Sequence, residues 1–87
     1  MAYVYILRCA DGSLYVGSTC NLTERIFWHN EGRGSRFTAS RRPVVLAFSE
    51  PHATMRSAAR RERQIKRWTR GKKEALLAGD YARLKAL

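Results

Sequence analysis

The segment that decides the fold is residues 3–19, which read YVYILRCADGSLYVGST. Two stretches rich in aromatic and β-branched residues, Tyr3–Cys9 and Ser13–Thr19, flank the turn-forming pair Asp11 and Gly12. Alternating apolar stretches around such a pair are typical of a β-hairpin. The sequence therefore predicts that the chain begins with two antiparallel strands.

The register of this hairpin is indicated by its apolar side chains. Side chains alternate between the two faces of a sheet, so a shift of one residue moves a whole set to the other face. A strict two-residue loop would place Val4 and Ile6 on the face of Tyr15. Shifting the pairing by one groups Val4, Ile6 and Val16 on one face and leaves Tyr5 and Tyr15 together on the other. We expect this second register, and hence a loop longer than two residues.

The next segment has the signature of a helix start. Asn21 and Glu24 have the spacing of a capping box, which predicts a helix from Leu22 to about Asn30 that ends before Gly32. At 100° per residue, Arg25 and His29 border the apolar stripe of this helix.

Residues 31–43 lack apolar periodicity and predict a solvated, phosphate-facing loop with room for a short helical turn at 35–39. This loop contains Arg33, Arg36, Arg41 and Arg42. The nearly continuous apolar run Val44–Phe48 follows and predicts a third strand, which we expect to be the best buried and to end at Glu50 and Pro51.

Helical patterns account for the rest of the chain. A helix is expected from near Thr54 through Trp68, broken by Gly71, and short helices at 72–78 and 81–87, the last packing back through Leu84 and Leu87. A chain of 87 residues has room for one domain, so we expect a single domain over residues 1–87.

Composition and charge limit the classes of function. The chain carries 17 Lys and Arg against 7 Asp and Glu, a net charge of +10, and is 45% hydrophobic. A folding chain this basic predicts a polyanionic partner, such as a nucleic acid. No apolar run long enough for a membrane span and no secretory signal are seen, and two cysteines are too few for a disulfide scaffold. We expect a cytoplasmic protein with both cysteines reduced.

Glu62 is the most informative charged residue. Between Arg56 and Lys73 there are nine Lys or Arg and one acid, and that acid falls in the apolar stripe of the predicted helix. A carboxylate near a core is paired, hydrogen-bonded or bound to a metal, because burying it alone costs several kcal/mol. Two interpretations remain open. One is a structural ion pair with Arg61, Lys66 or a loop arginine, and the other is a Mg²⁺ site completed by water and phosphate.

Taken jointly, these residues resemble the GIY-YIG endonuclease superfamily. The resemblance rests on Tyr3-Val4-Tyr5, then Tyr15-Val16-Gly17, then Arg25 and His29 on the first helix and Glu62 on the second. It covers essentially the whole chain and is closest to the small single-domain bacterial members. Tyr3-Val4-Tyr5 stands where the family has Gly-Ile-Tyr. Catalytically proven members usually carry an Asn after the glutamate, whereas no Asn follows Glu62.

The resemblance implies an α+β fold, a three-stranded antiparallel sheet flanked by helices, and a metal-dependent endonuclease. Tyr5, Tyr15, Arg25 and His29 would be catalytic, and Glu62 would hold Mg²⁺ or Mn²⁺. Arg25 would stabilise charge on the phosphate, and the general base stays open between Tyr5 and His29.

The expected partner is nucleic acid, DNA before RNA, selected by structure rather than by base sequence. The residues expected to contact it are Arg33, Arg36, Arg41, Arg42, Lys66 and Lys73. The alternative is a non-catalytic nucleic-acid-binding module of the same fold. The acid within a basic surface argues against that alternative, since plain binding requires no acid there.

Overall fold

A computed structural model of the protein describes residues 1–86 and has the expected α+β fold. Three antiparallel strands form one sheet in the order β2-β1-β3, so β1 is central. The elements in chain order are β1 (Ala2–Arg8), β2 (Leu14–Thr19), α1 (Leu22–Asn30), α2 (Arg36–Ala39), β3 (Val45–His52), α3 (Met55–Lys66), α4 (Arg70–Ala78) and α5 (Tyr81–Ala86).

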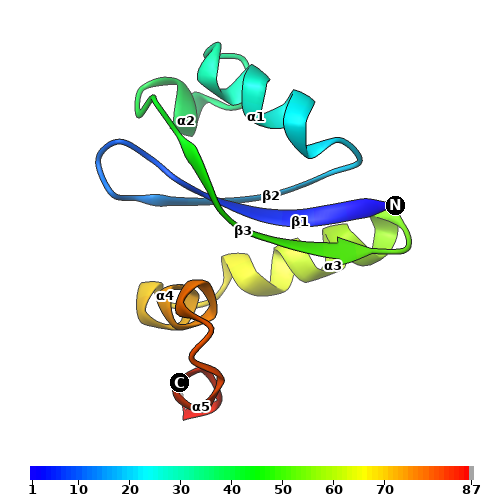
Figure 1. The fold of residues 1–87 in the computed structure, drawn as a ribbon, viewed down its shortest axis with the longest axis vertical. Helices are drawn as coiled ribbons and strands as arrows, with labels where there is room; N and C mark the ends of the chain where they lie inside the picture. The colour runs from blue at the N-terminus through cyan, green and yellow to red at the C-terminus, as the bar shows by residue number, and fades with distance from the viewer. Residues whose placement is uncertain (87) are drawn as a thin grey trace.

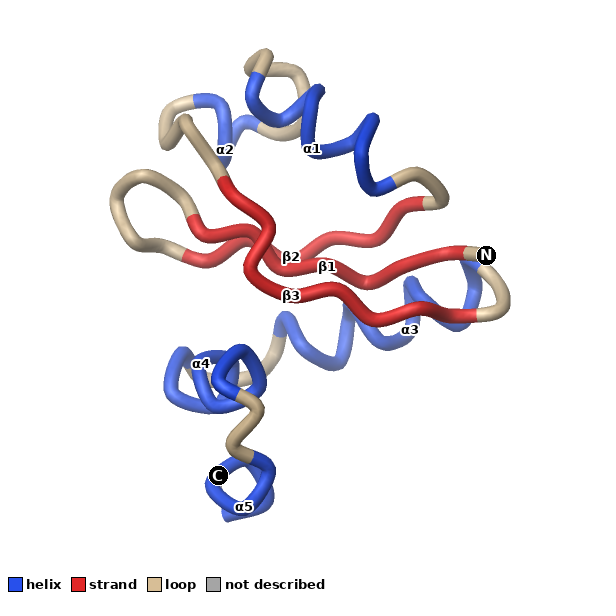
Figure 2. Tube along the Cα trace, viewed as in Figure 1, coloured by secondary structure: helices blue, strands red, loops and turns tan. Residues whose placement is uncertain are grey.

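Helices cover both faces of the sheet (Figure 1; Figure 2). The helices α1 and α2 lie on one face, and α3 crosses the other, followed by α4 and α5. Each face has its own apolar cluster, because β1 sends alternate side chains to opposite sides. Val4 and Ile6 pack with Ala58 and Ile65 of α3. The cluster on the other face contains Tyr5, Leu7, Cys9 and Val44, with Leu22 and Ile26 of α1 packed against it.

The expected register of the hairpin is confirmed. Ile6 pairs with Val16 and Tyr5 with Gly17, so Tyr5 and Tyr15 share a face. The loop is longer than two residues: the Cys9 amide donates to the Ser13 carbonyl at 2.9 Å, and Gly12 takes a positive φ of 85°. Glycine suits that position because it has no Cβ to oppose a left-handed backbone.

The expectation that Val44–Phe48 forms the best-buried strand is wrong. β3 is an edge strand, and its first residues Val45 and Leu46 are 60% and 42% exposed. The best-buried strand is β1, whose position between the two others covers it on both edges and both faces. The strand also continues past Pro51 to His52, which an edge position tolerates because proline lacks only an amide donor.

The helix boundaries follow capping residues. Asn21, Thr54 and Thr69 each accept a hydrogen bond from a backbone amide in the first turn of α1, α3 and α4. The expectation that Gly71 breaks the helix is wrong, because Gly71 lies inside the first turn of α4 and the break falls at residues 67–69.

At the end of the chain, Leu84 of α5 packs against the α3-side cluster as expected. Leu87, which was expected to pack beside it, lies outside the described residues. Within residues 1–86, no helix combines the length and apolar character needed to cross a membrane.

Candidate active site

The side chain of Tyr5 crosses from the central strand over β2. Its partner across the sheet is Gly17, and a Cβ at that position would overlap the hydroxyl and ring of Tyr5. The Tyr5 and Tyr15 rings lie 6.5 Å apart on this face. Because β2 is an edge strand, the Tyr5 hydroxyl leans toward the outer edge of the sheet.

His29, near the end of α1, holds the Tyr5 hydroxyl. Its Nε2 lies 2.9 Å from the Tyr5 hydroxyl oxygen, and its Nδ1 lies 2.8 Å from Oγ1 of Thr38 on α2. The imidazole is fully buried. A Cβ at Gly34 would overlap the ring, so the glycine lets the loop between α1 and α2 close over His29.

The hydrogen-bond network indicates the tautomer of His29. Oγ1 of Thr38 lies 2.9 Å from Ser35 Oγ and 3.4 Å from the Ser35 carbonyl, so the hydroxyl has acceptors for its own proton and can accept from His29. In that arrangement the Nδ1–H of His29 donates to Thr38, and Nε2 accepts from the Tyr5 O–H. The buried chain Tyr5–His29–Thr38 is then satisfied throughout.

Burial and local charge shift the pKa of both members of this pair. Burial, followed by the neighbouring Tyr15 hydroxyl, raises the pKa of Tyr5 to about 12, while the guanidinium of the exposed Arg25 acts in the opposite direction. Burial, and then the charge of Arg25, lowers the pKa of His29 below its usual range. At neutral pH, Tyr5 is therefore a protonated donor and His29 a neutral acceptor, with a cation close to both.

Glu62 approaches from the opposite face of the sheet. It lies on α3, where Ser18 Oγ donates to its Oε1 at 2.5 Å and the ammonium of Lys66 lies 2.6 Å from its Oε2. Ser18 pairs with Val4 and so faces α3 rather than α1. The negative charge of Glu62 is the smallest of the causes that act on the pKa of Tyr5. Of the two interpretations that the sequence left open, the ion pair with Lys66 is present.

A hollow of about 210 Å³ lies beside β2 and is lined by side chains from both faces of the sheet. Its lining comes from β2, α2, α3 and α4 and consists of Leu14, Tyr15, Val16, Phe37, Lys66 and Lys73. This hollow therefore exposes three of the residues that were predicted to act on or contact nucleic acid: Tyr15, Lys66 and Lys73. The Phe37 ring stacks on Tyr15 at 6.0 Å and carries the Arg41 guanidinium at 3.9 Å from its centroid.

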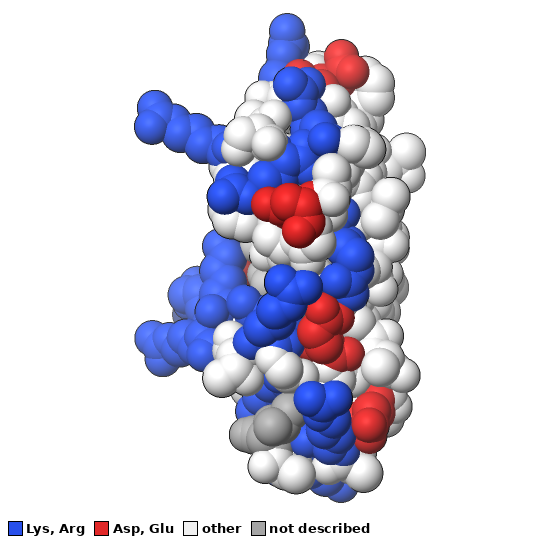
Figure 3. All heavy atoms as spheres, turned by 90° about the vertical axis from the view of Figure 1, so that its left-hand side faces the viewer, with Lys and Arg blue, Asp and Glu red and all other residues white. Residues whose placement is uncertain are grey.

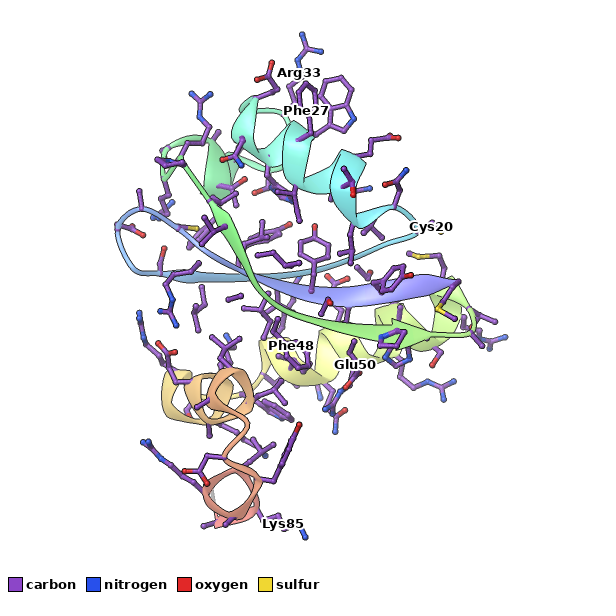
Figure 4. The ribbon with its side chains drawn as sticks, viewed as in Figure 1. Cys20, Phe27, Arg33, Phe48, Glu50 and Lys85 are labelled. Atoms are coloured by element: carbon purple, nitrogen blue, oxygen red, sulfur yellow. The ribbon has the colours of Figure 1, made fainter. Side chains whose placement is uncertain are left out.

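The four loop arginines divide into two pairs. Arg41 donates to the Asp11 carboxylate at 3.1 Å and to the Phe37 carbonyl at 2.8 Å, and Arg42 donates to the Ala39 carbonyl at 2.9 Å. These two stabilise the loop itself. Arg33 and Arg36 are exposed, and Figure 4 shows Arg33 at the outer end of α1, pointing away from the sheet. Of the predicted site residues, Tyr15, Lys66 and Lys73 line the hollow, and Tyr5 and His29 are buried on the α1 side of the sheet. Glu62 lies on the α3 side, and Arg33 lies farther out.

The donor set near β2 suits a lightly ligated divalent cation. Among residues 1–86 there is no group of three His, Cys, Asp or Glu side chains arranged to hold a metal. Glu62 stands as a single carboxylate, which fits Mg²⁺ because that ion keeps several waters and takes further oxygens from substrate phosphate. Lys66 already contacts Oε2 of Glu62, so a cation bound there would compete with the Lys66 ammonium.

Four residues of this region were missed by sequence reasoning. Thr38 and Gly34 fix His29, Ser18 fixes Glu62, and Phe37 lines the hollow. Only Thr38 carried a local signal, since Ser35 caps α2 through the Thr38 amide at the usual N-cap spacing. The other three are recognisable only from what lies next to them.

Positive charge is spread along the molecule. Figure 3 shows Lys and Arg atoms over the length of the viewed side, interrupted by smaller acidic patches, and a largely uncharged margin on the right. Acidic groups lie beside cations in the ion pairs Arg8–Glu74, Arg41–Asp11 and Arg70–Glu74. A surface with this excess of cations favours a phosphate-rich partner.

Comparison with known proteins gives consistent matches. The family model of the GIY-YIG catalytic domain matches residues 1–75. A UPF0213 protein of Bacillus pumilus is 50% identical over 72 residues, covering 83% of this chain and 74% of the relative. A UPF0213 protein of Staphylococcus aureus is 44% identical over 75 residues, covering 86% and 92%. The solution NMR structure of the UPF0213 protein BH0048 from Bacillus halodurans superposes with a TM-score of 0.58 at 39% identity, covering 90% of this chain and 84% of that one.

Proposed function

The chain belongs to the GIY-YIG family, and from that membership we propose that it is a metal-dependent endonuclease that hydrolyses phosphodiester bonds. We further propose that the substrate is DNA, selected by backbone shape rather than by base sequence. The observation that carries the proposal is the buried hydrogen bond between Tyr5 and neutral His29, with the exposed Arg25 acting on both and Glu62 on the other side of β2. A plain binding surface has no need of such a group.

In this proposal Tyr5 and His29 act together as the general base. A water molecule attacks the phosphorus while its proton passes to the Tyr5 oxygen, and the proton of Tyr5 passes to Nε2 of His29. The bond from phosphorus to the leaving oxygen breaks, and that oxygen takes a proton from solvent. The relay removes the need for a resting phenolate, which a tyrosine with a pKa of about 12 does not supply at neutral pH.

The cations around β2 bind and orient the phosphate. The guanidinium fork of Arg25 suits two phosphate oxygens, and its charge already acts on both Tyr5 and His29. Lys66 and Lys73 line the hollow and would hold the neighbouring phosphates as point charges. The stacked ring of Phe37 forms the wall of the hollow beside Tyr15.

Glu62 is the residue that would hold the divalent cation. The bound cation would polarise the phosphoryl and leaving oxygens. Ser18 keeps the carboxylate oriented by donating to Oε1, so Oε2, which now pairs with Lys66, would be the oxygen available to a cation. No Asn follows Glu62, so Lys66 and Lys73 would supply the phosphate contacts on that side.

Substrate selection by shape is suggested by the lining of the hollow beside β2. The hollow beside β2 is small and is lined by two lysines and apolar side chains, with no set of polar groups arranged to read base edges. Contacts with phosphates carry no base information, so selection has to come from the geometry of the backbone.

The second candidate is a nucleic-acid-binding module without turnover. One observation favours it: Oε2 of Glu62 is already neutralised by Lys66 at 2.6 Å, as in a structural ion pair. A binding module would retain the cationic surface and use Glu62 only to position Lys66.

A cleavage assay separates the two candidates. The protein is incubated with single-stranded, duplex and branched DNA in Mg²⁺ or Mn²⁺, as wild type, Glu62→Gln and Glu50→Gln. Glu50 is the matched control, because it is a half-buried glutamate paired with Arg61 at the other edge of the sheet. Loss of cleavage in Glu62→Gln alone supports the nuclease. Binding without cleavage by the wild type, or equal products from all three proteins, contradicts it.

A further inference from the structure

A row of arginines covers the face of α3 that points away from the sheet. Ala58 and Ile65 of this helix are buried against β1, and at 100° per residue Arg60, Arg63 and Arg67 lie on the opposite side, with Arg56 beside them. All four are exposed. The flank of α3 that carries Glu62 and Lys66 adjoins this arginine face and is centred roughly 90–130° farther around the helix.

Among the described residues, 1–86, the arginine face has no acidic partner. Other cations of the chain are engaged in ion pairs, for example Arg8 with Glu74 and Arg61 with Glu50. Within residues 1–86, neither an ion pair nor a hydrogen bond connects the side chains of Arg60, Arg63 and Arg67 to another residue. Their charge is therefore available to a ligand.

The spacing of these arginines acts against the helix. Arg56 and Arg60, like Arg63 and Arg67, are four residues apart, and Arg60 and Arg63 are three apart. Like charges at these separations repel each other and destabilise an isolated helix. An anionic ligand on this face would remove that repulsion.

The arginine face also borders a shaped surface. Arg60, Arg63, Gln64, Arg67 and Trp68 line a hollow of about 410 Å³. The Trp68 ring is held by cations, with Arg61 at 5.1 Å and Lys72 at 4.6 Å from its centroid. The ring therefore serves as a fixed wall, and the three arginines supply the charged part of the hollow.

We propose that the arginine face of α3 binds the phosphodiester backbone of a second nucleic-acid segment, distinct from the segment that lies in the hollow beside β2. This inference rests on the proposed function, because it assigns that nuclease a branched substrate. Duplex DNA is stiff over about 150 base pairs, so one straight duplex in the β2 hollow does not bend around a helix about 10–12 Å wide. A second arm of a branched molecule reaches the far side of α3 without bending.

The test measures binding without cleavage. Wild type and the double variant Arg60→Gln/Arg63→Gln are titrated, in chelator, with a straight duplex and with a branched DNA of equal total length, at several salt concentrations. The matched control is Arg83→Gln/Lys85→Gln, which removes the same charge from exposed positions of α5, where Figure 4 shows Lys85. Circular dichroism and thermal melting establish that all three proteins are equally folded.

We expect the α3 variant to bind the branched DNA at least about tenfold more weakly at 0.1 M salt. The slope of the logarithm of the binding constant against the logarithm of the salt concentration should be smaller by about 2, because each phosphate contact contributes about 0.9 to it. Binding to the straight duplex, and both affinities of the control, should change less than about twofold. Equal weakening on both DNAs, or none on the branched DNA, overturns the proposal. Arg60- and Arg63-dependent binding to anionic lipid vesicles, with DNA affinities unchanged, also overturns it.

These outcomes are distinguishable from failure of the nuclease assignment. The binding assay contains no divalent cation and uses no cleavage readout, so a catalytically inactive protein still reports on the arginine face. Conversely, the protein could cleave DNA in a Glu62-dependent way while the Arg60 and Arg63 substitutions leave the branched-DNA affinity unchanged. That result would reject the second DNA segment and retain the nuclease assignment.

Discussion

The hydroxyl of Tyr5 lies 2.9 Å from Nε2 of His29, and both side chains are withdrawn from solvent, at 1% and 0% exposure. The two candidates for the general base are thus joined in one hydrogen bond. A strand residue and a helix residue 24 positions apart form this contact, and Thr38 orients the imidazole from its other side.

Replacing Tyr5 by Phe should abolish the proton relay. We expect cleavage to fall by about 10²- to 10⁴-fold, the usual contribution of a general base, with DNA affinity nearly unchanged. Tyr3→Phe is the control, since Tyr3 lies on the same face, two residues closer to the start of β1. Single-turnover cleavage and binding titrations measure the two effects, and similar rates for both variants would remove Tyr5 from the chemistry.

The stability of the protein should fall at alkaline pH through Tyr5. Its pKa rises from 10.0 to about 12 on folding, so the unfolded chain loses the proton first and stability decreases as pH rises from 10 through 12. Two pKa units correspond to about 2–3 kcal/mol. Chemical denaturation at pH 9 and pH 12 should show a larger loss for wild type than for Tyr5→Phe. Parallel losses in the two proteins would contradict the raised pKa.

His29 should be neutral at pH 6.5. Its pKa is lowered by burial and by Arg25, so stability is present above pH 6.5 and is lost as pH falls through the lowered pKa. In a His52→Asn background the chain keeps one imidazole, which NMR follows directly. We expect its midpoint below 6.5, and adding Arg25→Gln should raise it. A midpoint at or above 6.5 would show that the ring is not desolvated.

Adding a methyl group at Gly17 should displace Tyr5. The new Cβ would overlap the Tyr5 hydroxyl, so Gly17→Ala should lower the melting temperature and reduce cleavage together. Gly79→Ala is the control: it strains a left-handed φ of 70° by about 1 kcal/mol but meets no neighbouring atom. It should cost stability while cleavage by the folded protein persists. Retained activity in Gly17→Ala would mean that Tyr5 has room to move.

Removing the charge of Lys66 should favour the metal. Lys66→Gln frees Oε2 of Glu62, so the Mn²⁺ concentration for half-saturation should fall several-fold, while DNA binding weakens by the loss of one cation. Calorimetric Mn²⁺ titration of the free protein measures the first effect. Lys73→Gln is the control, because Lys73 lines the same hollow but makes no ion pair with Glu62 among the described contacts. If the Mn²⁺ concentration for half-saturation fell equally in both variants, the cause would be the overall positive charge of the protein and not the Lys66–Glu62 ion pair.

Sequence reasoning succeeded where a feature depended on neighbouring residues. The register that places Tyr5 and Tyr15 on one face follows from alternation along two short strands, and α1 begins after its capping residue Asn21. It failed for β3. An apolar run indicates a strand but not its place in the sheet, and β3 lies at an edge with Val45 exposed.

The sequence by itself determined the α+β elements, the positive charge and the residues able to take part in catalysis or binding. It could do so because alternation, capping and charge can be read from the order of residues along the chain. Only the tertiary structure decided their relationships. It placed Thr38 behind His29, passed Tyr5 over Gly17, and brought Glu62 to β2 from the opposite face. Such contacts join residues that are distant in sequence, and they depend on which helix packs on which face of the sheet, which no local pattern records.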